Sequence, residues 1–308
     1  MEEKLLTCAK CAATRSLHSG RNNEKARRPM SEINLCPENG SDLHLMVRYG
    51  EIGENGVATL AALGNWLQEA AGRNADRLGF GEEALLPHGL TWVLTRLALR
   101  IVRLPRAGEE LVIHTWPSTM DRFGHRGYEV RDGNGTLIVT GTSAWSVMEL
   151  AGRCMARLPD QLAPKYPAAP RPCEPFACRV IPRIRPEEAS RCPLIVRRDD
   201  LDINGHVNNT RYLAWILENL PPAPALLHNW KEPLTPRLVD ITFRAESFPQ
   251  DKLECLCAPA LAPAGSPQEV FGRPVPCTRL HSIQRSADKG EVCRALTLWE
   301  KDPEQQSC

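Results

Sequence analysis

Residues 60–78 have the sequence LAALGNWLQEAAGRNADRL, and this stretch decides the fold. Its apolar side chains recur every three or four positions, which predicts a long amphipathic helix. Short apolar–polar alternations follow at 97–101 and 111–113 and predict strands. The residues DGNG at 132–135 predict a hairpin turn with a return strand over 136–148, because Gly and Asn tolerate positive φ angles. The order is therefore one helix and then several antiparallel strands.

This pattern occurs a second time. The residues WLQE at 66–69 match WILE at 215–218, an offset of 149, and Trp145 matches Trp299, an offset of 154. The second copy has, in chain order, a helical stripe at 213–220, strands around 237–245 and 252–258, a turn at 287–290 and a strand at 291–300. We therefore expect an α+β fold in which each half wraps an antiparallel sheet around one long helix. Two such sheets can pair side by side, which removes one exposed edge from each.

Changes in composition divide the chain further. The first 40 residues have few large apolar side chains, so we expect a disordered tail at 1–40. Eight prolines from Pro159 to Pro186 predict an extended linker, because proline lacks a backbone donor. The expected units are 41–158, the linker 159–187 and 188–308, with a second proline-rich insertion at 259–276.

The overall composition excludes several classes of protein. Lys and Arg number 38 against 37 Asp and Glu, so the chain has no global attraction to nucleic acid or anionic lipid. No window approaches the ~18 apolar residues of a membrane span. The 12 cysteines are irregularly spaced, and Cys8-x-x-Cys11 lacks a second pair for zinc. We expect a soluble cytoplasmic protein with reduced thiols and no metal.

The densest polar cluster, RRDDLDINGHVNN at 197–209, lies immediately before the second helix. Asp202, Asn204 and His206 alternate, so in extended backbone their side chains project to one side. The free N–H groups of a helix start favour a developing negative charge, which suits attack on a carbonyl-like centre. The alternative is that Asp and Asn only cap the helix and that the His is structural.

The repeat helps to decide between these two interpretations. Aligning the two Trp-containing stretches places Gly53, Asn55 and Val57 opposite the acid, the amide and the imidazole of the second half. If the cluster only capped the helix, the first half should need it too. This asymmetry favours a functional site in the second half alone.

Residues 198–218, RDDLDINGHVNNTRYLAWILE, resemble the signature of the acyl-ACP thioesterases, the plant and bacterial enzymes that end fatty-acid synthesis. The first half is similar to them through 49–53, 65–70, 90–96 and 157–159. The resemblance covers about 43–300 and implies a tandem hotdog fold, with acyl-chain binding in the first half and catalysis in the second. It also implies hydrolysis of a fatty-acyl thioester on acyl carrier protein without a cofactor, by a monomer or homodimer.

By the same resemblance, the catalytic positions are Asp202, Asn204, His206 and, within FRAES at 243–247, Glu246. The family often has Cys after this Glu, and Ser247 stands here, so a papain-like mechanism is not expected. Either Glu246 or Asp202 would activate water or attack the thioester directly, while His206 and Asn204 hold the reacting groups.

Two further sets of residues are candidates for binding. An apolar slot for the acyl chain could be lined by Trp66, Leu67, Ala70, Trp92 and Leu94, although core packing is the alternative for each. A basic surface for acidic acyl carrier protein could contain Arg96, Arg100, Arg103, Arg106, Arg122 and Arg126, although charged runs usually face solvent.

Two other functions remain open on the sequence alone. One is an acyl-CoA thioesterase of the same fold, which turnover of one acyl group on both carriers would distinguish. The other is a non-catalytic acyl-binding or regulatory module, which the intact polar cluster disfavours.

Overall fold

The computed structural model describes residues 39–166, 173–220, 234–263, 266–275 and 277–301. The first half supplies β1 (Ser41–Met46), η2 (Tyr49–Glu51), α1 (Leu60–Leu78), α2 (Glu82–Leu85), η3 (Leu86–His88), β2 (Leu90–Ile101), β3 (Glu110–Met120), β4 (Gly124–Asp132), β5 (Leu137–Glu149) and β6 (Met155–Ala156). The connection contains η4 (Ala163–Lys165) and η5 (Pro186–Glu188). The second half supplies β7 (Ser190–Ile195), η6 (Arg198–Asp200), α3 (Asn209–Glu218), β8 (Leu234–Phe243), β9 (Lys252–Ala260), β10 (Glu269–Val270), β11 (Arg273–Pro274), β12 (Cys277–Arg285) and β13 (Glu291–Lys301).

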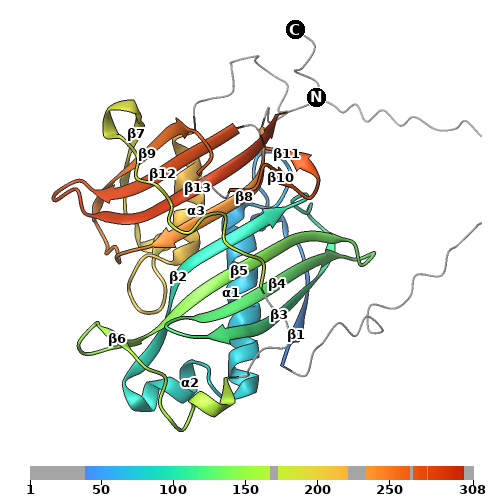
Figure 1. Ribbon diagram of the computed structural model, residues 1–308, viewed down its shortest axis with the longest axis vertical. Coiled ribbons are helices and arrows are strands. Elements are labelled where there is room, and N and C mark those ends of the chain that lie inside the picture. The colour runs from blue at the N-terminus through green and yellow to red at the C-terminus, as the bar shows by residue number, and fades with distance from the viewer. Residues whose placement is uncertain (1–38, 167–172, 221–233, 264–265, 276, 302–308) are drawn as a thin grey trace, which may run out of the picture. The chain divides into compact units, whose positions relative to one another are not determined.

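One antiparallel sheet joins the two halves (Figure 1). From its outer edge to the middle, the first half has the order β1-β3-β4-β5-β2 and the second half has the matching order β7-β9-β12-β13-β8. The halves meet where β2 pairs with β8, with Arg96 opposite Thr242 and Arg100 opposite Leu238. The expected α+β fold, its duplication and the side-by-side pairing of the two sheets are confirmed.

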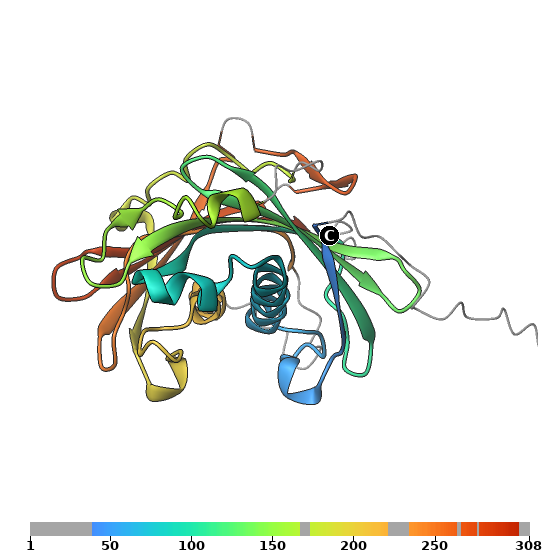
Figure 2. The same ribbon diagram turned by 90° about the horizontal axis from the view of Figure 1, so that it is seen from below.

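The helices α1 and α3 lie next to each other on the concave face of this sheet (Figure 2). Gly64 of α1 permits the close approach, because an added Cβ would lie 2.7 Å from Leu213 Cδ1 and 3.0 Å from Thr210 Cγ2. Real Cβ atoms essentially never come closer than 3.0 Å to a neighbour. The position of α3 therefore depends on a glycine in the other half.

Both helices begin in the same way. Thr59 caps α1 by accepting a hydrogen bond from Ala62 N, and Asn208 caps α3 by accepting one from Thr210 N. The second helix is shorter than expected, since it ends at Glu218 and leaves Leu220 outside. The side chain of Asn219 stops it there by donating to the carbonyls of Ser190 and Cys255.

The linker packs on the face of the sheet opposite the helices (Figure 2). Its described residues form no strand, as the prolines predict, but Ala177 and Ile181 are buried against Leu238 and Leu296. The backbone N–H of Ala177 donates to Asp240, which anchors the linker to β8. The linker is therefore part of the folded structure.

The two other expectations from composition have different outcomes. The tail predicted at 1–40 lies outside the described residues, except for its last two. The second proline-rich insertion begins later than expected, because Pro259 lies in β9 and pairs with Arg279. β7 pairs with β9 only up to Cys257, so Pro259 occupies an unpaired edge where its missing N–H costs nothing.

Candidate active site

The polar cluster before α3 forms a tight turn, not the extended strand that its alternation predicts. Leu201 and Val207 form a β-bridge, and the chain reverses between them with Gly205 at a φ of 76°. Oδ1 of Asp202 accepts hydrogen bonds from the backbone N–H of Asn204 at 2.8 Å and of His206 at 3.4 Å. The side chains of Asp202, Asn204 and His206 nevertheless reach one cavity.

The first half builds the same turn without the acid or the imidazole. Ile52 and Ala58 form the bridge, and Gly56 has a φ of 74°. The bond from Gly53 N to Val57 O, 2.8 Å long, matches the one from Asp202 N to His206 O, also 2.8 Å. Because the backbone closes equally well in both copies, the fold does not require Asp202 or His206. This comparison favours a chemical role for them.

Glu246 reaches the same place from the loop after β8. The N–H of Val207 donates to Ser247 O at 3.0 Å, which ties this loop to the turn. Glu246 Oε1 lies 3.6 Å from His206 Nδ1, and the imidazole packs edge-on against Phe248 at 5.2 Å between ring centroids. The four catalytic positions implied by the sequence are therefore brought together.

Arg153 is a neighbour of this site that the sequence did not indicate. It lies in the turn between β5 and β6, in the first half, and its guanidinium donates to Glu246 Oε2. Its Nη2 is 3.3 Å from His206 Nε2. No local pattern marks this residue, since only the topology brings it to the second half.

A cavity of about 560 Å³ connects these polar groups to an apolar interior. Its walls include small residues of α1, aromatic residues and the start of β2, namely Ala71, Gly72, Ala75, Phe80, Trp92, Leu94, Trp145 and Tyr166. Trp92 and Leu94 thus lie where the acyl slot was expected. The volume falls within the range of ~300–1,000 Å³ that is typical of small-molecule sites.

Three residues expected in this slot lie elsewhere. Trp66, Leu67 and Ala70 pack in the hydrophobic core, and Trp66 Nε1 donates to Glu51. Leu67 borders only a void of about 10 Å³, which is too small for an acyl chain. The periodic stripe faces the core, and the adjacent face of α1, with Ala71 and Ala75, lines the cavity.

Arg126 is in the cavity wall and not on a docking surface. It is 5% exposed, and its Nη1 donates to Asn74 Oδ1 and Thr115 Oγ1. Burial lowers the pKa of this guanidinium. Arg126 was expected to contact a protein partner, and its burial rules that out.

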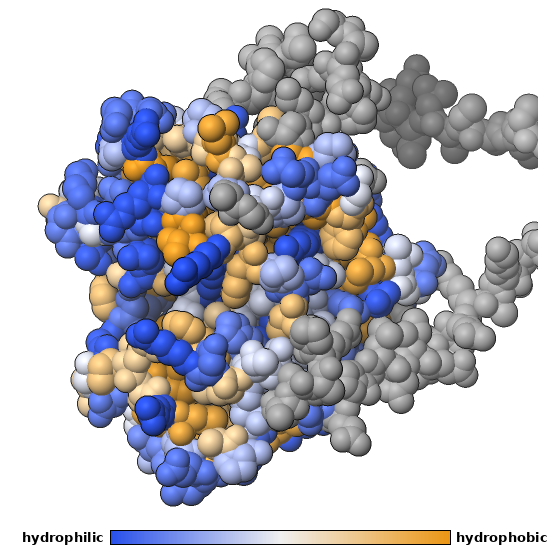
Figure 3. Space-filling view, in the orientation of Figure 1, coloured by the Kyte–Doolittle hydropathy of each residue, from blue (hydrophilic) through white to orange (hydrophobic). Residues whose placement is uncertain are grey.

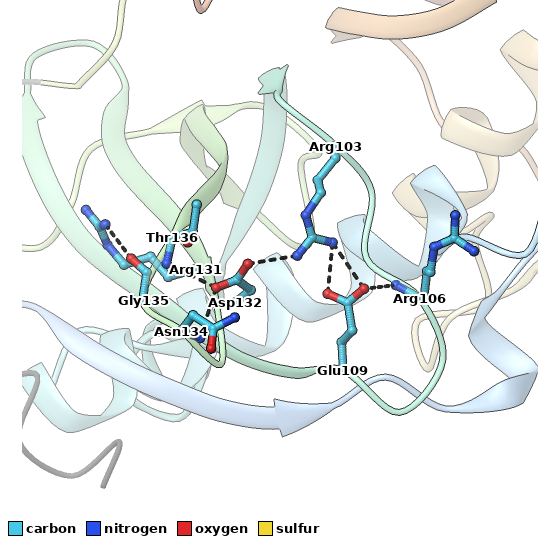
Figure 4. A network of polar contacts seen from close by, with 8 residues as sticks. All are labelled: Arg103, Arg106, Glu109, Arg131, Asp132, Asn134, Gly135 and Thr136. Atoms are coloured by element: carbon cyan, nitrogen blue, oxygen red, sulfur yellow. Dashed lines mark hydrogen bonds and ion pairs between the residues drawn. The ribbon is translucent and has the colours of Figure 1, made fainter. Parts of the chain in front are cut away.

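Arg103 stabilises the hairpin predicted at 132–135 (Figure 4). It donates to Glu109 and Asp132, and Asp132 also accepts from the N–H groups of Asn134 and Thr136. Burial opposes ionisation of Asp132, but the hydrogen bonds from Arg103 and the turn outweigh it and lower the pKa of this carboxyl.

The remaining candidate arginines differ in their partners and in their exposure. Arg96 is bound to Asp240 and to the linker carbonyl of Cys178, and Arg100 is 14% exposed beside Glu174. Arg122 is exposed in the β3–β4 turn. On the face in Figure 3, hydrophilic side chains are interspersed with apolar ones. The linker and the fold thus engage several of these arginines, while Arg106 and Arg122 are exposed, and a docking surface for acyl carrier protein stays a prediction.

Ser247 has no access to the cavity. It is fully buried below the turn, beside the hydroxyl of Tyr212. None of the cysteines in the described ranges lines the cavity, and burial raises the thiol pKa of Cys255 and Cys293. Within the described residues, neither Ser247 nor a cysteine thiol takes the place of the cysteine of a papain-like site.

Two further features bear on cofactors and membranes. Among the described residues, no group of three or more His, Cys, Asp or Glu side chains is arranged to hold a metal ion. None of the helices in the same residues combines the length and apolar character needed to cross a bilayer.

A doubled hotdog sheet with two acids, an amide and an imidazole at one cavity defines a thioester hydrolase of the hotdog class. Comparison with known families narrows this class. Residues 42–166 match the acyl-ACP thioesterase N-terminal domain, and residues 184–301 match the acyl-ACP thioesterase C-terminal domain. The chain therefore belongs to the acyl-ACP thioesterase family, as the sequence motif indicates.

Individual relatives support this assignment. Oleoyl-acyl carrier protein thioesterase 1 of Arabidopsis thaliana is 29% identical over 282 residues, which are 84% of this chain and 75% of that protein. An acyl-ACP thioesterase structure from Bacteroides thetaiotaomicron is 26% identical, with a TM-score of 0.69, over 85% of this chain and 98% of that one. The 12:0-ACP thioesterase of Umbellularia californica is 22% identical, with a TM-score of 0.71 over 86% and 95% of the two chains, and supports the fold alone.

Proposed function

We propose that this protein hydrolyses the thioester of a fatty acyl chain carried on acyl carrier protein and releases the free fatty acid. Family membership supports the reaction. The observation that carries the proposal for this chain is the single cavity shared by the polar turn of the second half and the apolar walls of the first. In this arrangement the first half binds the acyl chain and the second half cleaves the thioester.

Asp202 is the carboxylate best placed to act on the thioester or on a water molecule. The turn N–H groups hold its Oδ1, while Oδ2 has no hydrogen bond among the described residues and is available to the cavity. Glu246 is engaged at both oxygens, by Arg153 and His206. We therefore assign Asp202 as general base or nucleophile, and Glu246 and His206 as groups that hold the site in place.

The start of α3 supplies a place for the oxyanion. Asn209 is the first residue of the helix and lines the cavity. Its backbone N–H has no acceptor among the described residues. Together with the side-chain amide of Asn204, this N–H can donate to the carbonyl oxygen as negative charge develops there. Thioesters are reactive, so these donors and one base suffice.

The rates of hydrolysis of acyl-ACP and acyl-CoA test the proposal. The purified chain is assayed with one acyl group attached to acyl carrier protein and to CoA, and free acid is measured by mass spectrometry. Faster hydrolysis of acyl-ACP is expected, and faster hydrolysis of acyl-CoA would assign the protein to the second carrier. Binding of both without hydrolysis would assign a non-catalytic role.

The proposal also covers the location and the oligomeric state of the protein. We infer a cytoplasmic location and a monomer or homodimer, since two hotdog units already pair within one chain. The plant relatives that it resembles are chloroplastic. Cell fractionation and light scattering test these two points.

A further inference from the structure

We propose that Arg153 is a positioning residue that fixes the tautomer of His206 and so excludes this imidazole from acting as the base. This inference rests on the proposed function, because it assigns a role within the same site. It concerns a side chain from the first half that acts on a site in the second.

Arg153 can donate hydrogen bonds but cannot accept them. An arginine side chain has five N–H donors, no acceptor, and remains charged at all relevant pH values. Its Nη2 lies 3.3 Å from His206 Nε2. A neutral imidazole has one nitrogen that donates and one that accepts. Nε2 must therefore present its lone pair to Arg153, and the proton must be on Nδ1.

The other side of the ring supports the same assignment. Nδ1 of His206 faces Glu246 Oε1 at 3.6 Å, and the second oxygen of this carboxylate accepts from Arg153. Arg153 thus holds the acid on one side of the ring and occupies the lone pair on the other. Asp202 is a further charged neighbour, and its Oδ1 accepts from the backbone N–H of His206.

A chemical consequence follows for the reaction. With the lone pair of Nε2 directed at Arg153, the neutral ring of His206 has no free nitrogen that can accept a proton from water. The proton must therefore go to a carboxylate, and Asp202 is the one with a free oxygen.

The backbone at Arg153 is consistent with a functional role. Its φ is 47°, in the left-handed region that side chains other than those of Gly, Asn and Asp seldom adopt. The side chain is half-exposed, at 55%, so burial does not hold the residue in this conformation. Unfavourable backbone conformations of this kind are concentrated at functional sites, where neighbouring contacts maintain them.

The first test observes the tautomer directly and needs no substrate. Nitrogen-15 NMR of the full chain with labelled histidine, assigned with H206Q, should show the neutral imidazole of His206 as the Nδ1–H tautomer. R153Q should lose this preference for the Nδ1–H tautomer. An Nε2–H form in the wild type would overturn the inference, whether or not the protein hydrolyses acyl-ACP.

The second test uses the reaction. R153Q should lower kcat by about 100-fold, as for other misplaced catalytic groups, and change KM little. R153K should restore only part of the rate, because lysine lacks the planar fork. An R153Q variant with wild-type kcat would overturn the inference.

Two controls separate this role from a structural one. R157Q removes the same charge from an exposed neighbour on the same segment and should leave the rate and the tautomer of His206 unchanged. R153G should relieve the backbone conformation, so that Tm does not fall, while its kcat falls as in R153Q. An R153G variant that keeps wild-type kcat would contradict the proposal.

Discussion

Replacement of Gly64 by alanine tests how α1 and α3 are held together. The new methyl group would lie 2.7 Å from Leu213 Cδ1 and 3.0 Å from Thr210 Cγ2, where Leu213 is 1% exposed. Overpacking of a buried contact costs about 1–3 kcal/mol. Alanine gains about 1 kcal/mol of helix propensity over glycine. We therefore expect G64A to lower the free energy of unfolding by about 0–2 kcal/mol.

Gly72 provides a matched control on the same helix. An added Cβ there meets nothing within 4 Å, so G72A gains the propensity without a clash. It should raise the free energy of unfolding by about 0.5–1 kcal/mol. The difference between the two variants isolates the packing cost, expected at about 1–3 kcal/mol.

Urea unfolding with linear extrapolation measures both free energies. Equal stability of G64A and G72A would refute the reasoning that Gly64 sets the distance between the helices. Thr210 lies in the first turn of α3, next to the proposed oxyanion donor. G64A should therefore also reduce kcat on acyl-ACP, by up to about 100-fold for a shift of 1 Å.

Four further outcomes are expected. D202N should lower kcat at least 10³-fold, a loss on the order of that for a removed catalytic group, and leave Tm unchanged. A kcat within tenfold of wild type would reject Asp202 as the base. S247A should leave kcat within about twofold, since the hydroxyl is buried away from the cavity. A large loss would restore a nucleophile at this position. A75L adds three carbons to the cavity wall and should displace about three methylenes of a long acyl chain. The lost binding free energy of about 2.4 kcal/mol should lower kcat/KM for the longest substrate by about 60-fold and leave short substrates unaffected. An unchanged dependence of kcat/KM on chain length would place the acyl chain elsewhere. The pKa of Asp132 is lower in the folded protein than in the unfolded chain, so its carboxylate stabilises the fold above the unfolded pKa, and this stability is lost as the pH falls through the folded pKa. Tm should therefore fall less steeply with acid below about pH 4 in D132N than in wild type. Parallel curves of Tm against pH would exclude this contribution.

Features coded by neighbouring residues were predictable from the sequence. The apolar spacing of residues 60–78 gave a helix with the bounds of α1, and the two turns gave hairpins at the expected places. The duplicated Trp stretches were enough to predict two equivalent halves. These signals are local periodicities and turn chemistry, and they do not depend on the rest of the fold.

Features that depend on distant contacts were not predictable. The stripe of α1 identifies its buried face, but nothing in the spacing tells that Ala71 and Ala75 lie on a cavity while Leu67 lies in the core. Arg126 and Arg153 are both arginines of the first half, yet one is in the cavity wall and the other is at the mouth. The extended conformation expected for Asp202 to His206 was wrong, because Gly205 allows a reversal that alternation alone does not reveal.

The pairing of β2 with β8 has a consequence for how this enzyme can change over evolutionary time. Since the hydrogen bonds of one continuous sheet run through both copies, damage in one copy weakens the sheet of the other. Mutations that reshape the cavity wall in the first copy therefore also change the stability of the copy that contains Asp202 and His206. Diversification of substrate range is coupled in this way to the robustness of the whole chain.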